Sequence, residues 1–385
     1  MPIKWNEVPF STLFTSTSEY TDDLEQYPLY SLTIEDGITA KTERYERSHL
    51  VKKENSYKVV RPNDYAYNPM NIRFGAVARH KGDIPVAVSG YYDIFTTVHE
   101  SDLVFMDSFL TYGPMITYYN KVSTGSLVEK QRVHFSDFLE FSLALPPLEE
   151  RKKIAEILST QDKAIELQGR KIEGLKRFKK GCLEKMFPRK GQKVPEKRFP
   201  GFTGDWEQRK FEEIAVRSSV ICSDDTLPRV EYEDIVSGTG RLNKDIYAKQ
   251  SSKSGIVFHQ GDVLYGKLRP YLQNWLLPTF DGLAVGDFWV LQPQNADSSF
   301  LYRLIQSRQF DEVANQSTGT KMPRADWKLV SKTVFSIPSN ISEQAAIGTY
   351  FTALDSLITL HQRKPFLMKW RTSDANRNQT NRLVL

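Results

Sequence analysis

Residues 150–171 read ERKKIAEILSTQDKAIELQGRK, and residues 343–364 read EQAAIGTYFTALDSLITLHQRK. At a constant offset of 193 residues these stretches contain seven identical pairs, which are Glu150/Glu343, Ile154/Ile347, Asp162/Asp355, Ile165/Ile358, Leu167/Leu360, Arg170/Arg363 and Lys171/Lys364. Both stretches follow a proline-containing entry, and both are preceded by a Ser-Thr-Gly triplet, at 123–125 and 317–319. The collinear matches predict a tandem repeat in which a globular region is followed by a helix.

The first copy predicts a long helix over residues 146–187. Pro146 and Pro147 suit a helix start, and the acidic residues Glu149 and Glu150 would lie in the first turn, where the helix dipole favours them. About 38 residues at 1.5 Å each give a rod of roughly 57 Å, which a single globular domain cannot cover. We therefore expect this helix to pack on the helix of the second copy. The apolar stripe, which is also our candidate partner-binding surface, consists of Ile154, Leu158, Ile165, Ile172, Leu175, Ile347, Phe351 and Ile358.

The second helix is predicted to be shorter, over residues 338–364. Pro365 disfavours helical geometry at Lys364 and removes a backbone donor, and the tail at 365–385 is polar without a seven-residue stripe. We expect this helix to be about 15–20 residues shorter than the first, given the stop that proline imposes. A C-terminal truncation or frame change in the gene is one hypothesis for this departure.

The charge of the chain is localised. Its 385 residues have a formal net charge of +5, but residues 149–198 contain 16 Lys or Arg against 8 Asp or Glu. Such a basic block suits a polyanion or an acidic partner, and the alternative is a solvated charged helix. The two cysteines, Cys182 and Cys222, are too few for a disulfide framework, and no apolar run predicts a membrane span or a signal peptide. We expect a cytoplasmic protein.

Catalytic patterns are missing from the sequence. It contains no phosphate-binding P-loop, no dinucleotide-type glycine fingerprint and no metal-binding histidine pair. The nearest approach to an adenine-methyltransferase motif is the stretch from Asn68 to Asn71, which reads NPMN and has no terminal aromatic residue to stack a flipped base. This stretch favours a turn over a catalytic centre, so we predict neither catalytic nor metal-binding residues.

Several stretches resemble one known family. Residues 145–158, LPPLEERKKIAEIL, together with DKAIEL at 162–167, resemble the central conserved region of the specificity subunits of type I restriction–modification systems. Residues 198–210, RFPGFTGDWEQRK, resemble the opening of their target-recognition domains. The stretch GDVLYGKLRP at 261–270 and the Ser-Thr-Gly triplets are similar to recurring features of those domains. The resemblance covers roughly residues 1–364.

The resemblance implies an α+β fold in which two α/β target-recognition domains are separated by long antiparallel coiled-coil helices. The domains would span residues 1–145 and 206–337, with the central helix at 146–187, a linker at 188–205, the shortened helix at 338–364 and a divergent tail at 365–385. The globular regions differ in sequence outside their flanks. This difference predicts two copies of one task with different specificities.

The resemblance also implies a function and its partners. Each domain would recognise one half of a split double-stranded DNA target, without catalysis by this chain. Two methyltransferase (modification) subunits would dock around it, and restriction or translocase subunits would join them. S-adenosylmethionine, ATP and Mg would be bound by the partners, so no cofactor and no membrane are expected for this chain.

Candidate DNA contacts are cations and amides beside glycine and aromatic residues, because cations contact phosphates or guanine and amides read adenine. In the first region they are Asn68, Asn71, Arg73, Arg79, Lys81, Thr124, Lys130 and Arg132. In the second region they are Lys267, Arg269, Tyr271, Asn274, Thr318, Lys321 and Arg324. For any single one of them an ordinary surface residue is the alternative. Two other readings of the whole chain stay open at this stage: a helical scaffold that binds only proteins, and a self-sufficient DNA-modifying enzyme.

Overall fold

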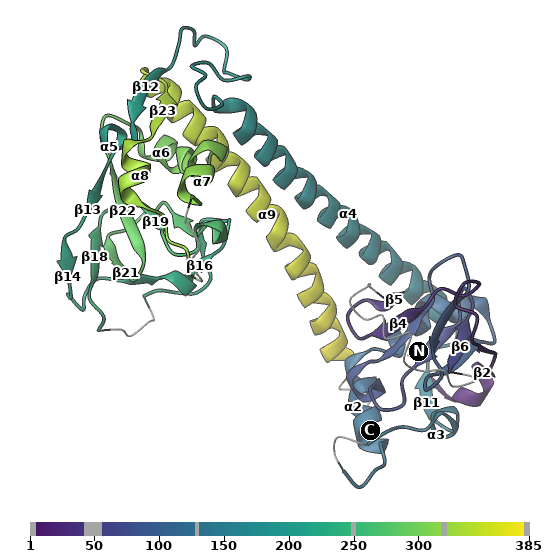
Figure 1. Ribbon diagram of the computed structural model, residues 1–385. Coiled ribbons are helices and arrows are strands. Elements are labelled where there is room, and N and C mark those ends of the chain that lie inside the picture. Colours follow the sequence, from purple (N-terminus) through teal and green to yellow (C-terminus); the bar gives the residue numbers. More distant parts are fainter. Residues whose placement is uncertain (1–4, 42–55, 128–130, 248–251, 317–321, 381–385) are drawn as a thin grey trace. The chain divides into compact units, whose positions relative to one another are not determined.

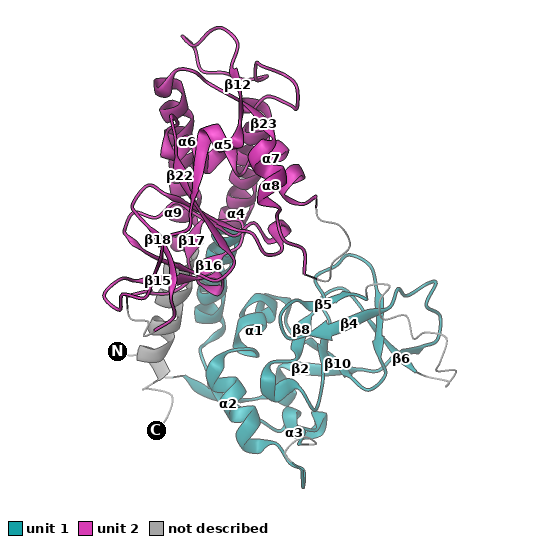
Figure 2. Ribbon diagram, turned by 60° about the vertical axis from the view of Figure 1, so that its left-hand side comes forward, with its two compact units in different colours: residues 1–166, 370–385 teal, residues 167–369 magenta. Residues whose placement is uncertain are grey.

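The computed structural model describes residues 5–41, 56–127, 131–247, 252–316 and 322–380. The chain divides into two compact units, residues 1–166 with 370–385 and residues 167–369 (Figure 2). The first unit contains domain 1 (residues 1–145), and the second contains domain 2 (residues 206–337). The long helices α4 (Leu148–Met186) and α9 (Ile341–Thr380) follow these domains in the chain.

The two domains have central sheets of the same antiparallel strand order. In domain 1 the order is β2 (Phe14–Thr17), β10 (Asp93–Thr97), β7 (Tyr65–Tyr67) and β8 (Val77–Arg79). In domain 2 it is β13 (Ala215–Ser218), β22 (Phe288–Pro293), β19 (Val263–Gly266) and β20 (Trp275–Leu276). A strand pair leads into each long helix, β1 (Asn6–Pro9) with β11 (Ser142–Leu145) and β12 (Glu207–Lys210) with β23 (Val334–Ile337). The repeat seen in the flanking sequence therefore extends to the fold of both domains.

The remaining elements surround these sheets. Domain 1 adds β3 (Tyr20–Thr21), β4 (Tyr30–Thr33), β5 (Gly37–Ala40), β6 (Tyr57–Val60), β9 (Val86–Ser89), the 3-10 turns η1 (Phe10–Thr12), η3 (Ile72–Phe74) and η4 (Glu100–Asp102), and the helices α1 (Leu103–Phe109), α2 (Gly113–Val122) and α3 (Phe135–Leu139). Domain 2 adds β14 (Ile221–Cys222), β15 (Arg229–Glu231), β16 (Ile235–Val236), β17 (Arg241–Leu242), β18 (Gly255–Phe258), β21 (Gly282–Val285), the 3-10 turns η6 (Tyr232–Asp234) and η7 (Pro270–Leu272), and the helices α5 (Phe211–Ile214), α6 (Ser298–Leu304), α7 (Arg308–Ala314) and α8 (Trp327–Lys332).

Aromatic side chains form the core of each domain. In domain 1 the Phe138 ring packs within 5.1–5.7 Å of the rings of Phe10, Phe14 and Phe95. In domain 2 Trp206 and Trp289 are each 2% exposed. Rings of this size supply most of the apolar area that a small domain can bury, so they account for the stability of such short strands.

Within the second unit, α4 and α9 lie alongside each other in opposite directions (Figure 1). Gln168 of α4 contacts His361 of α9, Lys179 contacts Asp355, and Cys182 contacts Tyr350. The partners on α9 move back along the chain as those on α4 move forward. The predicted antiparallel pairing of the two helices is therefore confirmed.

The predicted short second helix is wrong, because α9 continues past Lys364 and Pro365 to Thr380. Pro365 has no backbone N–H, so it cannot donate to the carbonyl of His361 four residues earlier. The amide of Gln168 on α4 donates to that carbonyl instead, at 3.0 Å, and also contacts the Nδ1 atom of His361 at 2.8 Å. The neighbouring helix thus replaces the hydrogen bond that the proline removes.

We expect Gln168→Leu to destabilise α9 around His361, because it leaves a buried carbonyl without this donor. The cost of such a group is about 1–3 kcal/mol. Urea unfolding and amide hydrogen exchange in α9 measure it. Lys171→Ala, an exposed position one turn further along α4, is the control and should change stability by less than about 0.5 kcal/mol. Equal exchange in both variants would argue against the replacement.

Residues 188–205, predicted as a linker, contain no helix or strand but are attached to domain 2. The Ser336 hydroxyl donates to the Gln192 carbonyl at 2.7 Å, and Arg198 forms an ion pair with Glu343 at the start of α9 at 2.7 Å. The segment therefore fastens the end of α4 to domain 2, although its composition resembles that of a flexible connection.

Candidate nucleic-acid interface

The candidate stretches follow equivalent strands of the two domains. Strands β7 and β19 occupy the same place in the two central sheets, and each is followed by a short 3-10 turn, η3 in domain 1 and η7 in domain 2. Residues 68–74 and 267–272 therefore lie at the same point of the repeated fold. The sequence interpretation paired these two stretches by their composition, and the topology gives them equivalent places in the two sheets.

In domain 2 the backbone joins this stretch to the segment after the second Ser-Thr-Gly triplet. The Lys267 carbonyl accepts from the Ala325 amide at 2.8 Å, and the Arg269 amide donates to the Pro323 carbonyl at 2.7 Å. We call residues 267–274 and 322–325 together the domain 2 loop pair. The structure thus brings Arg324 next to Lys267 and Arg269, which lie in a much earlier part of the sequence.

One carboxylate, that of Asp287, forms ion pairs with two cations of this loop pair. Asp287 lies 3.6 Å from the Lys267 ammonium and 3.0 Å from the Arg324 guanidinium. The hydrogen bond from Arg324 lowers the pKa of Asp287, and the nearby Lys267 adds to this effect. Two cations against one carboxylate leave a net positive charge, and the Arg324 side chain is 52% exposed. Its planar guanidinium suits a phosphate or a guanine edge.

Two residues of the loop pair have left-handed backbone conformations without being glycine. Arg269 has a φ of +48° and Gln273 a φ of +56°, a conformation that costs on the order of 1 kcal/mol or more per residue. The buried Asn274 holds this turn, since its side-chain oxygen accepts from the Ser237 hydroxyl at 2.8 Å and its carbonyl accepts from the Gly266 amide at 2.6 Å. A Cβ at Gly266 would lie 2.9 Å from that carbonyl, so this position needs glycine.

The prediction that Asn274 contacts DNA has to be corrected, because its side chain is buried and supports the turn. Tyr271, by contrast, is 57% exposed and lies on η7 between the two strained residues. The lysine and the two arginines of the loop pair remain candidates, together with this tyrosine.

In domain 1, two polar side chains of the corresponding region, residues 68–74, form hydrogen bonds within the domain. The Asn68 side chain accepts from the backbone of Asn71 at 3.3 Å, and Arg73 donates to Gln131 at 2.7 Å. Asn68 and Arg73 are both buried, so their predicted contact with DNA is corrected to a structural role. Asn71 is exposed, and its amide side chain remains a candidate for reading adenine.

The second candidate segment of domain 1 lies against the first. The Val133 amide donates to the Pro69 carbonyl at 3.0 Å, and Thr124 forms a short antiparallel bridge with Arg132. Thr124 is exposed and Arg132 half-buried. We call residues 68–75 with 124–127 and 131–133 the domain 1 loop pair, because it corresponds in place to the loop pair of domain 2.

Arg79 and Lys81 belong to another cluster of domain 1. Both contact Asp107 on α1, at 2.8 and 3.2 Å, and Arg79 also donates to Asn63 at 2.7 Å. The hydrogen bond to Asp107 raises the pKa of Arg79. This cluster borders a pocket of about 550 Å³. Of the two cations, only Lys81 is well exposed, at 68% of its side chain.

Three further candidates, Lys130, Thr318 and Lys321, lie outside the residues that the structure describes. Sequence reasoning also overlooked Asp107 and Asp287, the two carboxylates that pair with candidate cations. Both are acidic residues inside otherwise ordinary stretches, and no local signal would have marked them.

The apolar stripe of the long helices serves different purposes along its length. Ile154 packs against the core of domain 1, and Ile347 and Phe351 belong to the core of domain 2. For these three residues the expectation of a partner-facing surface is wrong, because the first turns of each helix cover their own domain. Ile358 is 8% exposed, and the remaining members are half-buried: Leu158, Ile165, Ile172 and Leu175.

Among the residues with a described position, no three His, Cys, Asp or Glu side chains are grouped to hold a metal ion. No helix within those same ranges is long and apolar enough to cross a bilayer.

Fold and site together define a class of protein with two α/β domains of one topology, unlike loop pairs and a long helix after each domain. Residues 107–177 match the family described as the type I restriction modification DNA specificity domain. This part of the chain is thus similar to the type I restriction–modification specificity subunits, the family that its sequence motifs resemble.

Two curated proteins are similar to this chain over a longer stretch. The chain is 25% identical over 227 residues to the type I restriction enzyme EcoDI specificity subunit of Escherichia coli, a match that covers 51% of each protein. It is 25% identical over 251 residues to the MjaVIII specificity subunit of Methanocaldococcus jannaschii, covering 59% of this chain and 58% of that one. These matches span between half and three fifths of the relatives' length.

Solved structures share the fold over nearly the whole chain. A type I restriction–modification system studied for its complex assembly and conformational transition gives a TM-score of 0.58 at 14% identity, covering 97% of this chain and 96% of the other. The specificity subunit of the M. genitalium system gives 0.57 at 12% identity, covering 97% and 95%. The predicted fold class, two α/β domains with long antiparallel helices, is therefore confirmed.

Proposed function

We propose that this chain is the DNA-recognition subunit of a type I restriction–modification complex and that each domain contacts one half of a bipartite target. The observation that carries the proposal is the equivalence of the two loop pairs. They occupy the same point of a repeated fold, yet present different side chains. Two domains with the same fold but different loop residues suit the recognition of two different DNA sequences.

The exposed groups have the chemistry that DNA recognition needs. In domain 2, Lys267 and Arg324 would contact phosphates or guanine, and Tyr271 would pack against sugar or base. In domain 1, Asn71 would read a base edge, and Arg132 with Thr124 would contact the backbone. The internal contacts beneath these residues hold the loops in one conformation before DNA arrives, which lowers the entropy lost on binding.

Protein partners are proposed from the long helices. Large apolar side chains stay exposed on both, and they are Ile157, Leu167 and Phe178 on α4 and Leu357 and Leu360 on α9. Exposed apolar groups on a helix favour contact with another protein. We propose that two methyltransferase subunits dock there, with restriction or translocase subunits attached to them. These partners would bind S-adenosylmethionine, ATP and Mg in the cytoplasm, while this chain selects the sequence and performs no chemistry.

Sequencing of methylated adenines in cells with and without this chain tests the proposal. We expect a two-part motif with a gap of fixed length, methylated in both halves only when the chain is present. Exchange of residues 206–337 for the corresponding domain of another specificity subunit should change one half of the motif and keep the other. Methylation that is independent of this chain, or a motif without two parts, would contradict the proposal.

A further inference from the structure

A groove of about 1250 Å³ lies within the second unit, between the last half of α4, the middle of α9 and the hairpin β16–β17 of domain 2. Seven lysines or arginines line it against three carboxylates. None of these cations was a candidate from the sequence, because they come from four separate segments. The imbalance of charge indicates an anionic ligand.

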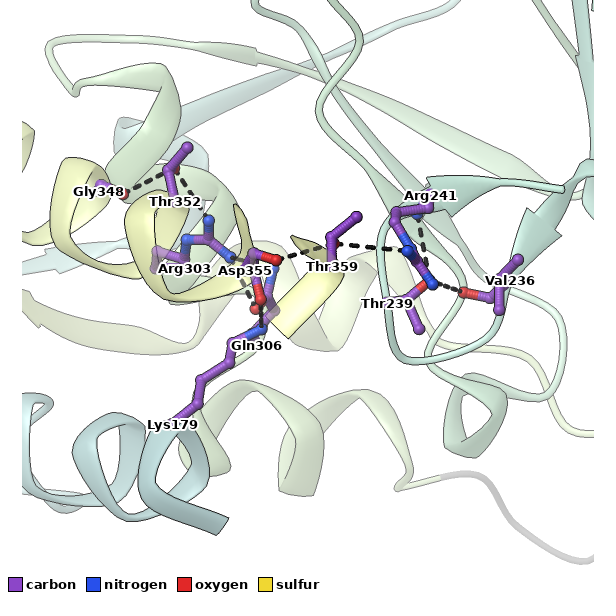
Figure 3. A network of polar contacts seen from close by, with 10 residues as sticks. All are labelled: Lys179, Val236, Thr239, Arg241, Arg303, Gln306, Gly348, Thr352, Asp355 and Thr359. Atoms are coloured by element: carbon purple, nitrogen blue, oxygen red, sulfur yellow. Dashed lines mark hydrogen bonds and ion pairs between the residues drawn. The ribbon is translucent and has the colours of Figure 1, made fainter. Parts of the chain in front are cut away.

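The floor of the groove holds two cations that share one carboxylate (Figure 3). Asp355 lies 2.6 Å from the Lys179 ammonium and 2.8 Å from the Arg303 guanidinium. Arg303 is 2% exposed, and Thr352 fixes it further by accepting a hydrogen bond at 3.1 Å. Its Nε atom is buried and has no hydrogen-bond partner among the described residues. The floor is therefore a fixed, incompletely neutralised positive surface.

Lys179 is strongly desolvated in this arrangement. Burial lowers its pKa, although the Asp355 carboxylate acts in the opposite direction. The Lys179 ammonium has lost much of its hydration, and its carboxylate partner Asp355 also pairs with Arg303. The positive charge of Lys179 is therefore only partly neutralised. An additional anion in the groove would relieve this condition, because it would supply the second negative charge.

The rim of the groove offers cations without carboxylate partners. The guanidinium of Arg241, at the start of β17, donates to the Thr359 hydroxyl on α9 at 3.4 Å, and the Arg241 backbone amide donates to the Thr239 hydroxyl at 3.3 Å (Figure 3). Neither Arg241 nor Lys180 forms an ion pair with any residue that the structure describes. Gly240 holds the hairpin in place, since it has a φ of +66° and a Cβ there would collide with the Tyr302 hydroxyl. The Arg241 guanidinium is thus held at the rim by one hydrogen bond, and its other N–H groups can donate to a ligand.

The groove is continuous with the domain 2 loop pair. Gln273 lines the groove, and its carbonyl accepts from the Gly238 amide in the β16–β17 hairpin at 3.0 Å. Ser237 of the same hairpin donates to Asn274 at 2.8 Å. A duplex that touches Tyr271 and Lys267 would therefore pass next to the mouth of the groove.

We propose that this groove binds backbone phosphates of the duplex beyond the half-site that domain 2 reads. The inference rests on the proposed function and adds a sequence-independent contact to it. The Ser356 hydroxyl lines the α9 wall, and hydroxyls together with Lys and Arg are the usual phosphate donors of proteins. The hydroxyls of Thr352 and Thr359 line the same wall but donate to the carbonyls of Gly348 and Asp355. An acidic protein segment would pair with the same cations, but its binding would leave the salt dependence of DNA binding unchanged, so the two occupants can be distinguished.

Salt-dependent DNA binding by the complex with its methyltransferase tests this groove. We compare wild type with Lys180→Ala/Arg241→Ala on the target duplex and on a shuffled duplex. Each lost phosphate contact should reduce the slope of log K against log salt by about 0.9, so the double variant should lose about two units of slope. Its preference for the target over the shuffled duplex should be unchanged.

Matched variants make the result specific to the groove. Lys210→Ala/Lys328→Ala removes two exposed charges of domain 2 that do not line the groove, and it should keep the wild-type slope. Arg241→Lys keeps the charge and should also keep it. An unchanged slope in the groove variant would overturn the inference, as would a loss of methyltransferase assembly with normal DNA binding. A wild-type complex without any preference for the target would instead overturn the proposed function.

Discussion

Glu343→Ala is expected to lower the free energy of unfolding of domain 2 by about 3–5 kcal/mol, the range for removing one partner of a buried ion pair. The Glu343 side chain is 2% exposed and receives two hydrogen bonds from Arg198, at 2.7 and 2.8 Å, and one from the Trp206 indole at 3.2 Å. Its hydrogen bonds also raise the pKa of Arg198. Alanine would leave the indole N–H without its acceptor and the Arg198 guanidinium without its carboxylate partner, with only the carbonyls of Thr203 and Gly204 still accepting from it.

The repeat provides a matched control for this variant. Glu150 is the counterpart of Glu343 in the first copy, but its buried Oε2 atom has no hydrogen-bond partner in the described ranges. Glu150→Ala should therefore cost less than about 1 kcal/mol, the usual effect of a substitution that breaks no network. Urea unfolding followed by tryptophan fluorescence, to which domain 2 contributes four of the six tryptophans, measures the first variant. Hydrogen exchange resolves both domains. Equal losses in the two variants would contradict a special role of Glu343.

The sequence predicts those features that depend on local pattern. Periodic apolar residues from Ile154 onward are sufficient for the long helix α4, and the repeated flanks are sufficient for the duplication. The positions of the candidate loops were also predictable, since glycine, proline and asparagine clusters such as residues 68–75 mark irregular backbone next to strands. The structure adds that the two candidate loops follow strands with equivalent places in the sheets of domains 1 and 2.

The predictions that were wrong concern residues whose structure depends on contacts with distant parts of the sequence. Proline at 365 predicted a helix end, but Gln168 lies 193 residues before His361 and replaces the missing donor. Arg73 and Asn274 looked like DNA contacts because polar side chains are usually exposed, and only the fold shows that they hold turns from inside.

The groove of the second unit was invisible for the same reason. Its cations Lys179, Arg241 and Arg303 belong to different elements, and no window of sequence contains two of them. The basic excess of residues 149–198 predicts an anionic or acidic partner, but it does not show which lysines meet the arginines of domain 2. Charge along a chain predicts the sign of a partner, whereas the fold determines the surface.

The largest effect on DNA binding is expected from Lys267→Ala/Arg324→Ala. In the wild type these two cations, Arg269 and Asp287 sum to a net charge of about +2, and the double variant lowers it to about 0 and leaves the Asp287 carboxylate without its two ion-pair partners. Loss of two contacts of about 1–3 kcal/mol each, with repulsion added, should weaken binding of the target by about a hundredfold or more. Fluorescence anisotropy with the methyltransferase complex measures this loss.

Base substitutions in the target show which half is affected. In the double variant, changes in one half-site should lose their penalty, while changes in the other half should keep it, because the domain 1 loop pair is untouched. Asp287→Asn serves as the control, since it removes the negative charge and should strengthen binding to target and shuffled duplexes alike. If changes in both halves lost their penalty together, the two domains would not read DNA independently, and the duplication would have to serve another purpose.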